Sequence, residues 1–261
     1  MIRFEDYHRT IVGYHGTRLS VALDIINRRK GFEFSENEGD WLGHGVYFWE
    51  YAPQQALWWA NRLKKRAEKS RRSEGKPDDR RPWDEPIAIL GSMIRLGFCL
   101  DLLDPYNIRY AKKVHDRFCD DRSRLRLPIP KNRRHRRDRD CAVFQYLYTS
   151  LEEGGARASR VVDTARAVYV TTDEKKRIWP GSWIYDDSHI QVCVRNPACI
   201  LGTWLHYPSS DGGTDGIRSS EVAEVGVESP DRAGRQAIGE DVPARADSAP
   251  GQGEAADPGT S

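Results

Sequence analysis

The chain has 261 residues, of which 38% are hydrophobic, and its 41 Lys and Arg nearly balance its 39 Asp and Glu. The low hydrophobic content argues against a chain that is compact along its whole length. The five cysteines are odd in number and form no C-x-x-C pair, which excludes a recognisable disulfide framework or zinc site and favours a reducing cytoplasm. No apolar run approaches the roughly 18 residues of a membrane span, so we expect no membrane partner.

The overall charge of +2 hides two parts of opposite sign. Residues 208–261 contain no Phe, Tyr, Trp, Leu or Cys and carry eleven acidic residues against four arginines, which predicts a disordered acidic tail. Residues 1–207 keep 37 Lys and Arg against 28 Asp and Glu. We therefore expect one folded domain over residues 1–207. Either the acidic tail screens the positive charge of this domain, or the domain binds a polyanion. A solvated basic surface with an inert tail is the alternative.

The first elements of this domain surround a histidine. Residues 11–14 (IVGY) predict a short buried strand that delivers His15 at its end. A helix is predicted to follow, with Ser20 as its N-cap and Gly31 at its C-cap. The histidine is therefore expected at a junction between a strand and a helix.

A glycine-rich loop comes next. Glycines at positions 39, 43 and 45 precede the apolar run at 46–49, which is typical of a loop that enters a strand. Pro53 opens a predicted helix that extends to about residue 69. A basic insertion is expected at about 62–85.

The second half of the domain is predicted to supply most of the sheet. Residues 87–103 are mostly apolar and predict one or two central strands, and a second basic insertion is expected at about 120–139. Asp140 is predicted to cap a helix that ends near residue 153, and strands are predicted at 165–170 and 189–194. The predicted fold class is α+β.

Three segments of the chain together resemble the ADP-ribosyltransferase superfamily, in its poly(ADP-ribose)-polymerase-like branch with a His-Tyr-Glu triad. They are YHGT at 14–17, GHGVYF at 43–48 with Trp58 eleven residues after Tyr47, and HIQVCV at 189–194. The resemblance covers residues 11 to about 205. It implies a split mixed β-sheet with flanking helices, NAD as the substrate and no metal.

NAD chemistry explains these residue types. Cleavage of the glycosidic bond creates an oxocarbenium-like ribose and a neutral nicotinamide, so a site must hold a flat ring and orient hydroxyl groups. The resemblance assigns a ribose hydroxyl to His15, close backbone contact with the carboxamide to Gly16, and stacking on the nicotinamide to two aromatic rings. The residues expected to bind NAD are His15, Gly16, Thr17, Tyr47 and Trp58. A satisfied structural histidine and a core tryptophan are the alternatives, although Trp59 fits the core better by helical phase.

The third catalytic position departs from the family pattern. Many members have a glutamate there, whereas this chain has Gln191, which alternation places opposite Ile190 and Val192. A glutamine orients hydroxyls without supplying negative charge, which argues against chain elongation and for a single transfer. Glu50 is the nearest other carboxylate by sequence and could act as an additional acid or base. The expected catalytic residues are His15, Tyr47, Gln191 and Glu50.

The function implied is a mono-ADP-ribosyltransferase that moves ADP-ribose from NAD to a nucleic acid or a protein. Family analogy adds a toxin-like intracellular effector with a neutralising partner. An NAD glycohydrolase, an RNA 2′-phosphotransferase and an inactive module that binds NAD or ADP-ribose are the alternatives. Arginines outnumber lysines 31 to 10 and concentrate at 62–81 and 122–139, which favours a nucleic-acid acceptor. A GC-rich genome is the competing explanation of that bias.

Overall fold

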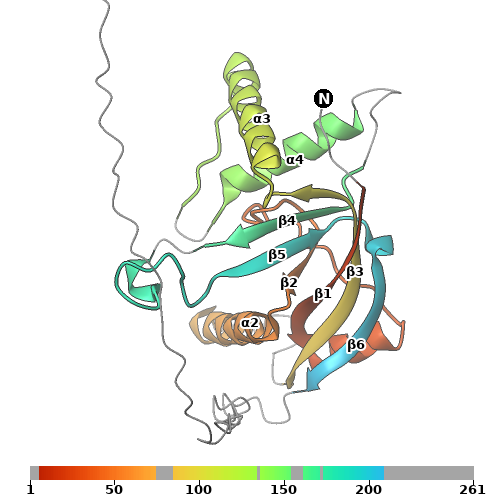
Figure 1. Ribbon diagram of the computed structural model, residues 1–261. Coiled ribbons are helices and arrows are strands. Elements are labelled where there is room, and N and C mark those ends of the chain that lie inside the picture. Colours follow the sequence, from red (N-terminus) through yellow and green to blue (C-terminus); the bar gives the residue numbers. More distant parts are fainter. Residues whose placement is uncertain (1–5, 75–84, 134–135, 154–160, 171–172, 209–261) are drawn as a thin grey trace, which may run out of the picture. The chain divides into compact units, whose positions relative to one another are not determined.

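The computed structural model describes residues 6–74, 85–133, 136–153, 161–170 and 173–208 (Figure 1). The fold is α+β, with a six-stranded mixed sheet and four α-helices in this part of the chain. Backbone contacts divide the chain into units of residues 1–216 and 217–261, and every described residue belongs to the first. The predicted acidic tail lies outside the described residues, except for Pro208 at the end of the last strand. None of the described helices is long and apolar enough to cross a membrane.

The strands and helices follow one another in a mixed order. The strands are β1 (Asp6–Arg18), β2 (Val46–Glu50), β3 (Ile87–Asp101), β4 (Thr164–Tyr169), β5 (His189–Val194) and β6 (Ile200–Pro208). The helices are α1 (Leu19–Ile26), α2 (Pro53–Glu74), α3 (Pro105–Arg124) and α4 (Asp138–Glu152).

The sheet brings distant parts of the chain together. β1 pairs with β2 and β3, β2 pairs with β5, β5 with β4, and β4 with β3, so these five strands are joined in a closed order. β6 pairs with β3 as the sixth strand, and only β3 and β4 are parallel. Because β2 lies between β1 and β5, the three segments that carry the family resemblance lie on or beside three neighbouring strands.

Apolar side chains fill both sides of this sheet. One cluster of buried residues lies among the strands themselves and includes Ile11, Phe48, Ile94 and Val192. On the other side, α4 and the end of α3 cover β4 and β5, and α2 packs its small residues against β1 and β3. Trp59 packs in the α2 cluster while Trp58 is exposed, as the helical phase predicts.

The N-terminal elements differ from their predicted bounds. β1 pairs with β3 along almost its whole length, so residues 15–17 lie inside this strand rather than after it. α1 begins immediately afterwards, so Ser20 is not its cap, and the Ser20 hydroxyl donates to Glu85 instead. The helix also ends at Ile26, before Gly31.

Two elements occupy places where the sequence pattern predicts none, α3 and β6. Asp104 caps α3 by accepting a hydrogen bond from the backbone N–H of Tyr106, and the helix extends into the basic insertion expected at 120–139. α2 likewise extends to Glu74 and makes the start of the insertion at 62–85 helical, whereas residues 75–84 lie outside the described part. α4 begins at Asp138, so the predicted cap at Asp140 is wrong. The strands are divided evenly between the two halves of the domain.

Candidate functional site

His15 lies where β1 and β2 separate. The pairing of these strands includes only Gly13 with Glu50 and Tyr14 with Trp49, so the next residues of β1 have no partner on β2. The imidazole of His15 crosses this fork, and its Nδ1 is 2.9 Å from the carbonyl oxygen of Tyr47. A carbonyl can only accept, so Nδ1 carries the proton and Nε2 keeps its lone pair. Burial lowers the pKa of His15, which keeps the ring neutral.

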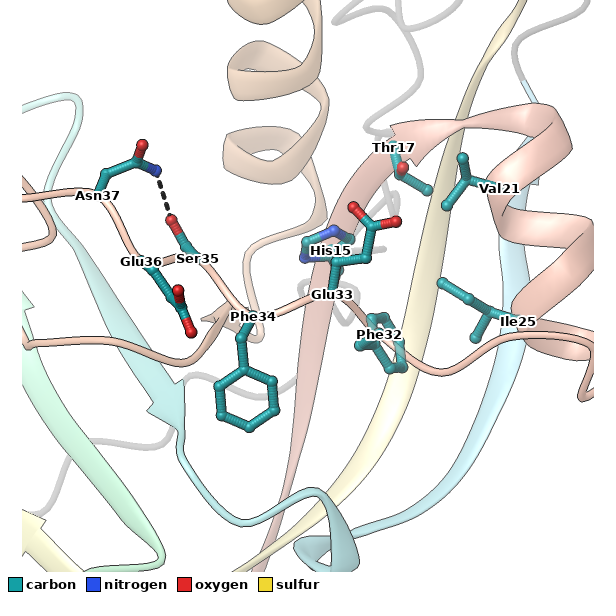
Figure 2. A pocket seen from close by; sticks show the side chains of 10 residues that line it. All are labelled: His15, Thr17, Val21, Ile25, Phe32, Glu33, Phe34, Ser35, Glu36 and Asn37. Carbon is teal, nitrogen blue, oxygen red and sulfur yellow. Dashed lines mark hydrogen bonds between the residues drawn. The ribbon is translucent and has the colours of Figure 1, made fainter.

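The pocket of about 460 Å³ beside His15 is lined by β1, α1 and the loop before β2 (Figure 2). His15 and Thr17 are both in its lining, with apolar groups from α1 and polar groups from the loop. Glu33 and Glu36 give it an acidic character, and no lysine or arginine is among the described residues that line it. The ring of Phe32 meets the His15 imidazole edge to face at 5.5 Å and holds it in place. A neutral acceptor and two carboxylates suit the hydroxyl groups of a sugar.

Tyr47 fixes the glycine loop. Its hydroxyl donates to the carbonyl of Gly43 at 2.7 Å and accepts from the N–H of Leu42 at 3.0 Å. Gly43 has a φ of +81°, and a Cβ there would lie 2.8 Å from the ring of Tyr148, so the turn requires glycine. Burial raises the pKa of Tyr47, which leaves the phenol neutral. Tyr47 is partly exposed, and its side chain packs against the cluster of buried residues between α4 and the sheet.

Gln191 shares a face of the sheet with Tyr47. It pairs with Trp49 on β2, and Cys193 pairs with Tyr47, so the four side chains form adjacent cross-strand pairs. The indole N–H of Trp41 donates to Oε1 of Gln191 at 2.5 Å. Because an indole N–H can only donate, this bond fixes the amide and leaves its NH₂ to donate elsewhere. Trp41 is a partner that sequence reasoning missed, since it is 150 residues away in the chain.

Cys193, beside Gln191 on this face, is not a candidate nucleophile. Burial raises the pKa of its thiol to about 12, so the thiolate is not populated near neutral pH. All five cysteines are free thiols. In the described part of the chain, no group of His, Cys, Asp and Glu side chains could hold a metal ion.

Gly16 faces α2 rather than the pocket. A Cβ at this position would lie 2.3 Å from the carbonyl oxygen of Ala56 and 2.9 Å from the Cβ of Ala60. The missing side chain therefore lets α2 approach β1 closely. This packing explains the glycine without a ligand.

Trp58 projects from the exposed side of α2. Its side chain is 53% exposed, and the guanidinium of Arg62 lies 5.3 Å from the ring centroid. One indole face is thus already covered by a cation. A nicotinamide that stacks on that face has to displace Arg62, so the structure does not bring Trp58 to Tyr47 in a ready-made sandwich.

Glu50 lies on the opposite face from Gln191, inside the sheet. Both of its carboxylate oxygens accept from Arg166, at 2.5 and 2.8 Å, and Arg166 also donates to Asp101 at 3.0 Å. The Glu50 side chain is 3% exposed. Its negative charge is neutralised and enclosed, which argues against the additional acid or base role. Arg166 gives no signal in the sequence because its partners lie on other strands.

Comparisons with known proteins do not identify a relative. No protein-family model, no curated protein and no solved structure matches this chain.

Proposed function

We propose that this chain is an NAD-dependent mono-ADP-ribosyltransferase with an ADP-ribosyltransferase-like split sheet. The observation that carries the proposal is the fork between β1 and β2, where His15 donates to the carbonyl of Tyr47 and offers Nε2 as an acceptor beside the pocket. The three resembling segments come from distant parts of the chain, and their meeting on β1, β2 and β5 supports a common site. NAD would place its ribose hydroxyls at His15 and the acidic pocket.

The register places the His15 side chain on one face of the sheet and Tyr47 and Gln191 on the other, so NAD would have to span the fork between β1 and β2. Nicotinamide leaves as a neutral ring, and the positive charge that develops on the ribose needs oriented hydroxyls and a polar surrounding. Tyr47 offers a ring for the nicotinamide, and Gln191 offers amide donors held by Trp41. Without a carboxylate at the third position, the site suits one transfer rather than elongation. The chain would act on NAD as a substrate without a metal.

Two alternative functions use the same NAD site but do not transfer ADP-ribose to a macromolecule. A glycohydrolase passes ADP-ribose to water, and an inactive module only binds NAD. An RNA 2′-phosphotransferase needs cations around a phosphate, whereas the charged side chains among the described residues of the pocket lining are the carboxylates of Glu33 and Glu36, which disfavours it.

The test uses the full chain with NAD labelled on the adenylate phosphate, with and without RNA or cell protein. Label on a macromolecule supports transfer, free ADP-ribose alone supports hydrolysis, and intact NAD contradicts both activities. Tyr47→Ala should abolish nicotinamide release. Tyr51→Asn is the matched control, because Tyr51 is 62% exposed just after β2 and its φ of +50° suits asparagine. Equal activity of folded Tyr47→Ala and wild type would contradict the assignment of this site.

We infer that the acceptor is nucleic acid, guided by the basic loop at residues 122–137. This segment has eight Lys and Arg and no acidic residue. Arg136 donates to Glu38 at 2.9 Å, and Glu38 directly follows the pocket residue Asn37, so the basic loop is attached to the rim of the pocket. Arginine side chains match phosphate oxygens and stack on bases, which suits a single strand.

Salt dependence separates this role from a solvated surface. Replacing Lys131, Arg133 and Arg137 by Gln should make the log-log slope of RNA affinity against salt shallower by about 2, at roughly 0.7 per phosphate contact. Exchange of Lys65, Arg66 and Lys69 in α2 removes the same charge elsewhere and should leave the slope nearly unchanged. Equal slopes for both variants would assign the acceptor to protein. Nicotinamide release without acceptor should be the same in all three proteins.

A further inference from the structure

The face of the sheet that carries Gln191 holds a second histidine, His189, at the first position of β5. Residues 189, 191 and 193 alternate onto the same side, and His189 pairs with Tyr169 on β4. The imidazole stacks on the Tyr169 ring with centroids 4.9 Å apart and planes 17° apart. Trp41 also contacts this ring pair. Its ring meets Tyr169 edge to face, and its indole N–H donates to Gln191. His189 therefore belongs to one aromatic cluster with the third-position residue.

The hydrogen bonds of His189 leave one ring nitrogen unused. Nδ1 is 2.7 Å from the carbonyl oxygen of Asp187, so this nitrogen carries the proton. Nε2 is a buried lone pair that has no hydrogen-bond partner in the described part of the chain. A buried acceptor without a donor costs about 1–3 kcal/mol, so a fold retains one where a ligand or a reaction uses it.

ADP-ribosyl transfer needs such a group. The acceptor X–H forms a bond from X to C1′ of the ribose, the bond from C1′ to the nicotinamide nitrogen breaks, and nicotinamide keeps the electron pair. The proton of X has to go to a base. Gln191 cannot accept it as a carboxylate would, Glu50 is neutralised by Arg166, and the His15 side chain lies on the opposite face of the sheet from Gln191.

We propose that His189 is the catalytic base of the transfer, whose Nε2 takes the proton of the acceptor in place of a third-position carboxylate. This inference rests on the proposed ADP-ribosyl transfer. Nε2 is buried whereas the imidazole as a whole is only partly so, and acceptor binding therefore has to uncover this atom. The proton leaves to solvent after nicotinamide has departed. Water at the same position gives hydrolysis.

The surroundings of His189 favour a neutral base. Burial lowers its pKa, and the carbonyl and carboxylate of Asp187 only partly oppose that effect. Among the described residues, the titratable groups that interact with the ring are Tyr169 from β4 and Asp187 before β5, and Lys176 pairs with Asp187 at 2.5 Å. The ion pair with Lys176 offsets the negative charge that would otherwise favour a protonated imidazole.

The experiment measures nicotinamide release against pH in the full chain. His189→Asn keeps an N–H near the position of Nδ1, and with it the bond to Asp187, but has no nitrogen base. We expect its kcat to fall about 100-fold with an unchanged KM for NAD, since a general base contributes 10²–10⁴-fold. Wild-type kcat should rise with pH through a group whose pKa lies below 6.5, and the variant should lack this acid limb. Free imidazole should restore part of the rate in His189→Ala.

The outcomes separate a catalytic from a structural role. A fall in kcat together with a raised KM, an acid limb that persists and no rescue by imidazole would overturn the proposal, as would a folded His189→Asn variant with full activity. His115→Asn on α3, where the imidazole is 35% exposed, is the matched control and should behave like wild type. If wild type releases no nicotinamide at all, the proposed function itself fails, and the base falls with it.

Discussion

At the scale of single residues, the protonation of His15 is the feature with the clearest consequence. Nδ1 donates to Tyr47, so Nε2 is free to accept a ribose hydroxyl only while the ring is neutral. Burial lowers the pKa of His15 below its ordinary value of 6.5. The neutral ring also stabilises the fold fully above pH 6.5, and this contribution is lost as the pH falls through the lowered pKa.

We predict that the KM for NAD is constant while His15 is neutral and rises as the pH falls through its lowered pKa, which lies below 6.5. Protonation of Nε2 replaces an acceptor by a donor and removes the hydroxyl bond. His15→Asn should have a high KM at every pH, because its amide NH₂ keeps the donor to Tyr47 but the shorter side chain has no acceptor at the position of Nε2. Steady-state kinetics from pH 5 to 8 check this. If the KM of the wild type does not change with pH, His15 does not contact the substrate.

Glu50 gives a second prediction at this scale. Glu50→Gln removes one partner of a buried ion pair and leaves Arg166 with Asp101 alone, so the free energy of unfolding should fall by about 3–5 kcal/mol. The folded fraction should release nicotinamide at the wild-type rate, because the carboxylate is enclosed on the other face. Denaturant unfolding and activity per folded molecule measure the two effects. A stable but inactive variant would restore Glu50 as the catalytic acid or base.

Gln191 gives a third prediction at the scale of single residues. Gln191→Ala should lower kcat about 100-fold if its amide orients the transition state, the scale of removing one preorganised donor. Trp41→Phe should have a smaller effect in the same direction, because the amide stays but loses the donor that fixes it. The ratio of kcat values for the two variants checks this order. Equal activity of Gln191→Ala and wild type would remove Gln191 from the site.

At the scale of elements, the contact between β1 and α2 depends on Gly16. A Cβ there would lie 2.3 Å from a backbone oxygen of α2, which cannot move without the helix. Gly16→Ala should therefore lower the free energy of unfolding by about 1–3 kcal/mol, as overpacking does, and shift Trp58 with the helix. Gly202→Ala on β6 is the control, because a Cβ there meets open space. Thermal unfolding of both variants tests this, and an unaffected Gly16→Ala protein would contradict the packing role.

At the scale of the whole molecule, charge is the property that extends over the chain. The overall charge of +2 combines a basic body with an acidic stretch after residue 208. β6 ends at Pro208, so a chain shortened to residues 1–208 keeps every strand and helix described. We predict that this shortened chain has a melting temperature close to that of the full chain and binds single-stranded RNA more tightly at low salt. Calorimetry measures the melting temperature, and filter binding measures the affinity for RNA. Weaker RNA binding after truncation would mean that the acidic stretch does not screen the positive charge of residues 1–207.

The sequence by itself determined what local pattern and composition control. Period-two alternation placed Gln191 opposite Val192, and helical phase separated Trp59 from Trp58. The domain boundary near residue 208 stays a prediction, since residues 209–261 lie outside the described part of the chain. Alternation and helical phase depend on neighbours within a few residues, so they are readable without a fold. The length of α3 and the existence of β6 were not readable in this way, because packing and pairing with β3 stabilise them.

Only the tertiary structure decided which of these residues meet. In the fold, Glu50 pairs with Arg166, and Gly16 packs against α2. The indole of Trp41 donates to Gln191, and Nδ1 of His15 donates to the carbonyl of Tyr47. Each of these contacts joins residues 32 to 150 positions apart and depends on how the strands and helices are arranged. Alternation within a strand indicates which residues share a face, but which strand lies beside it, and therefore which side chains meet, is decided by the fold.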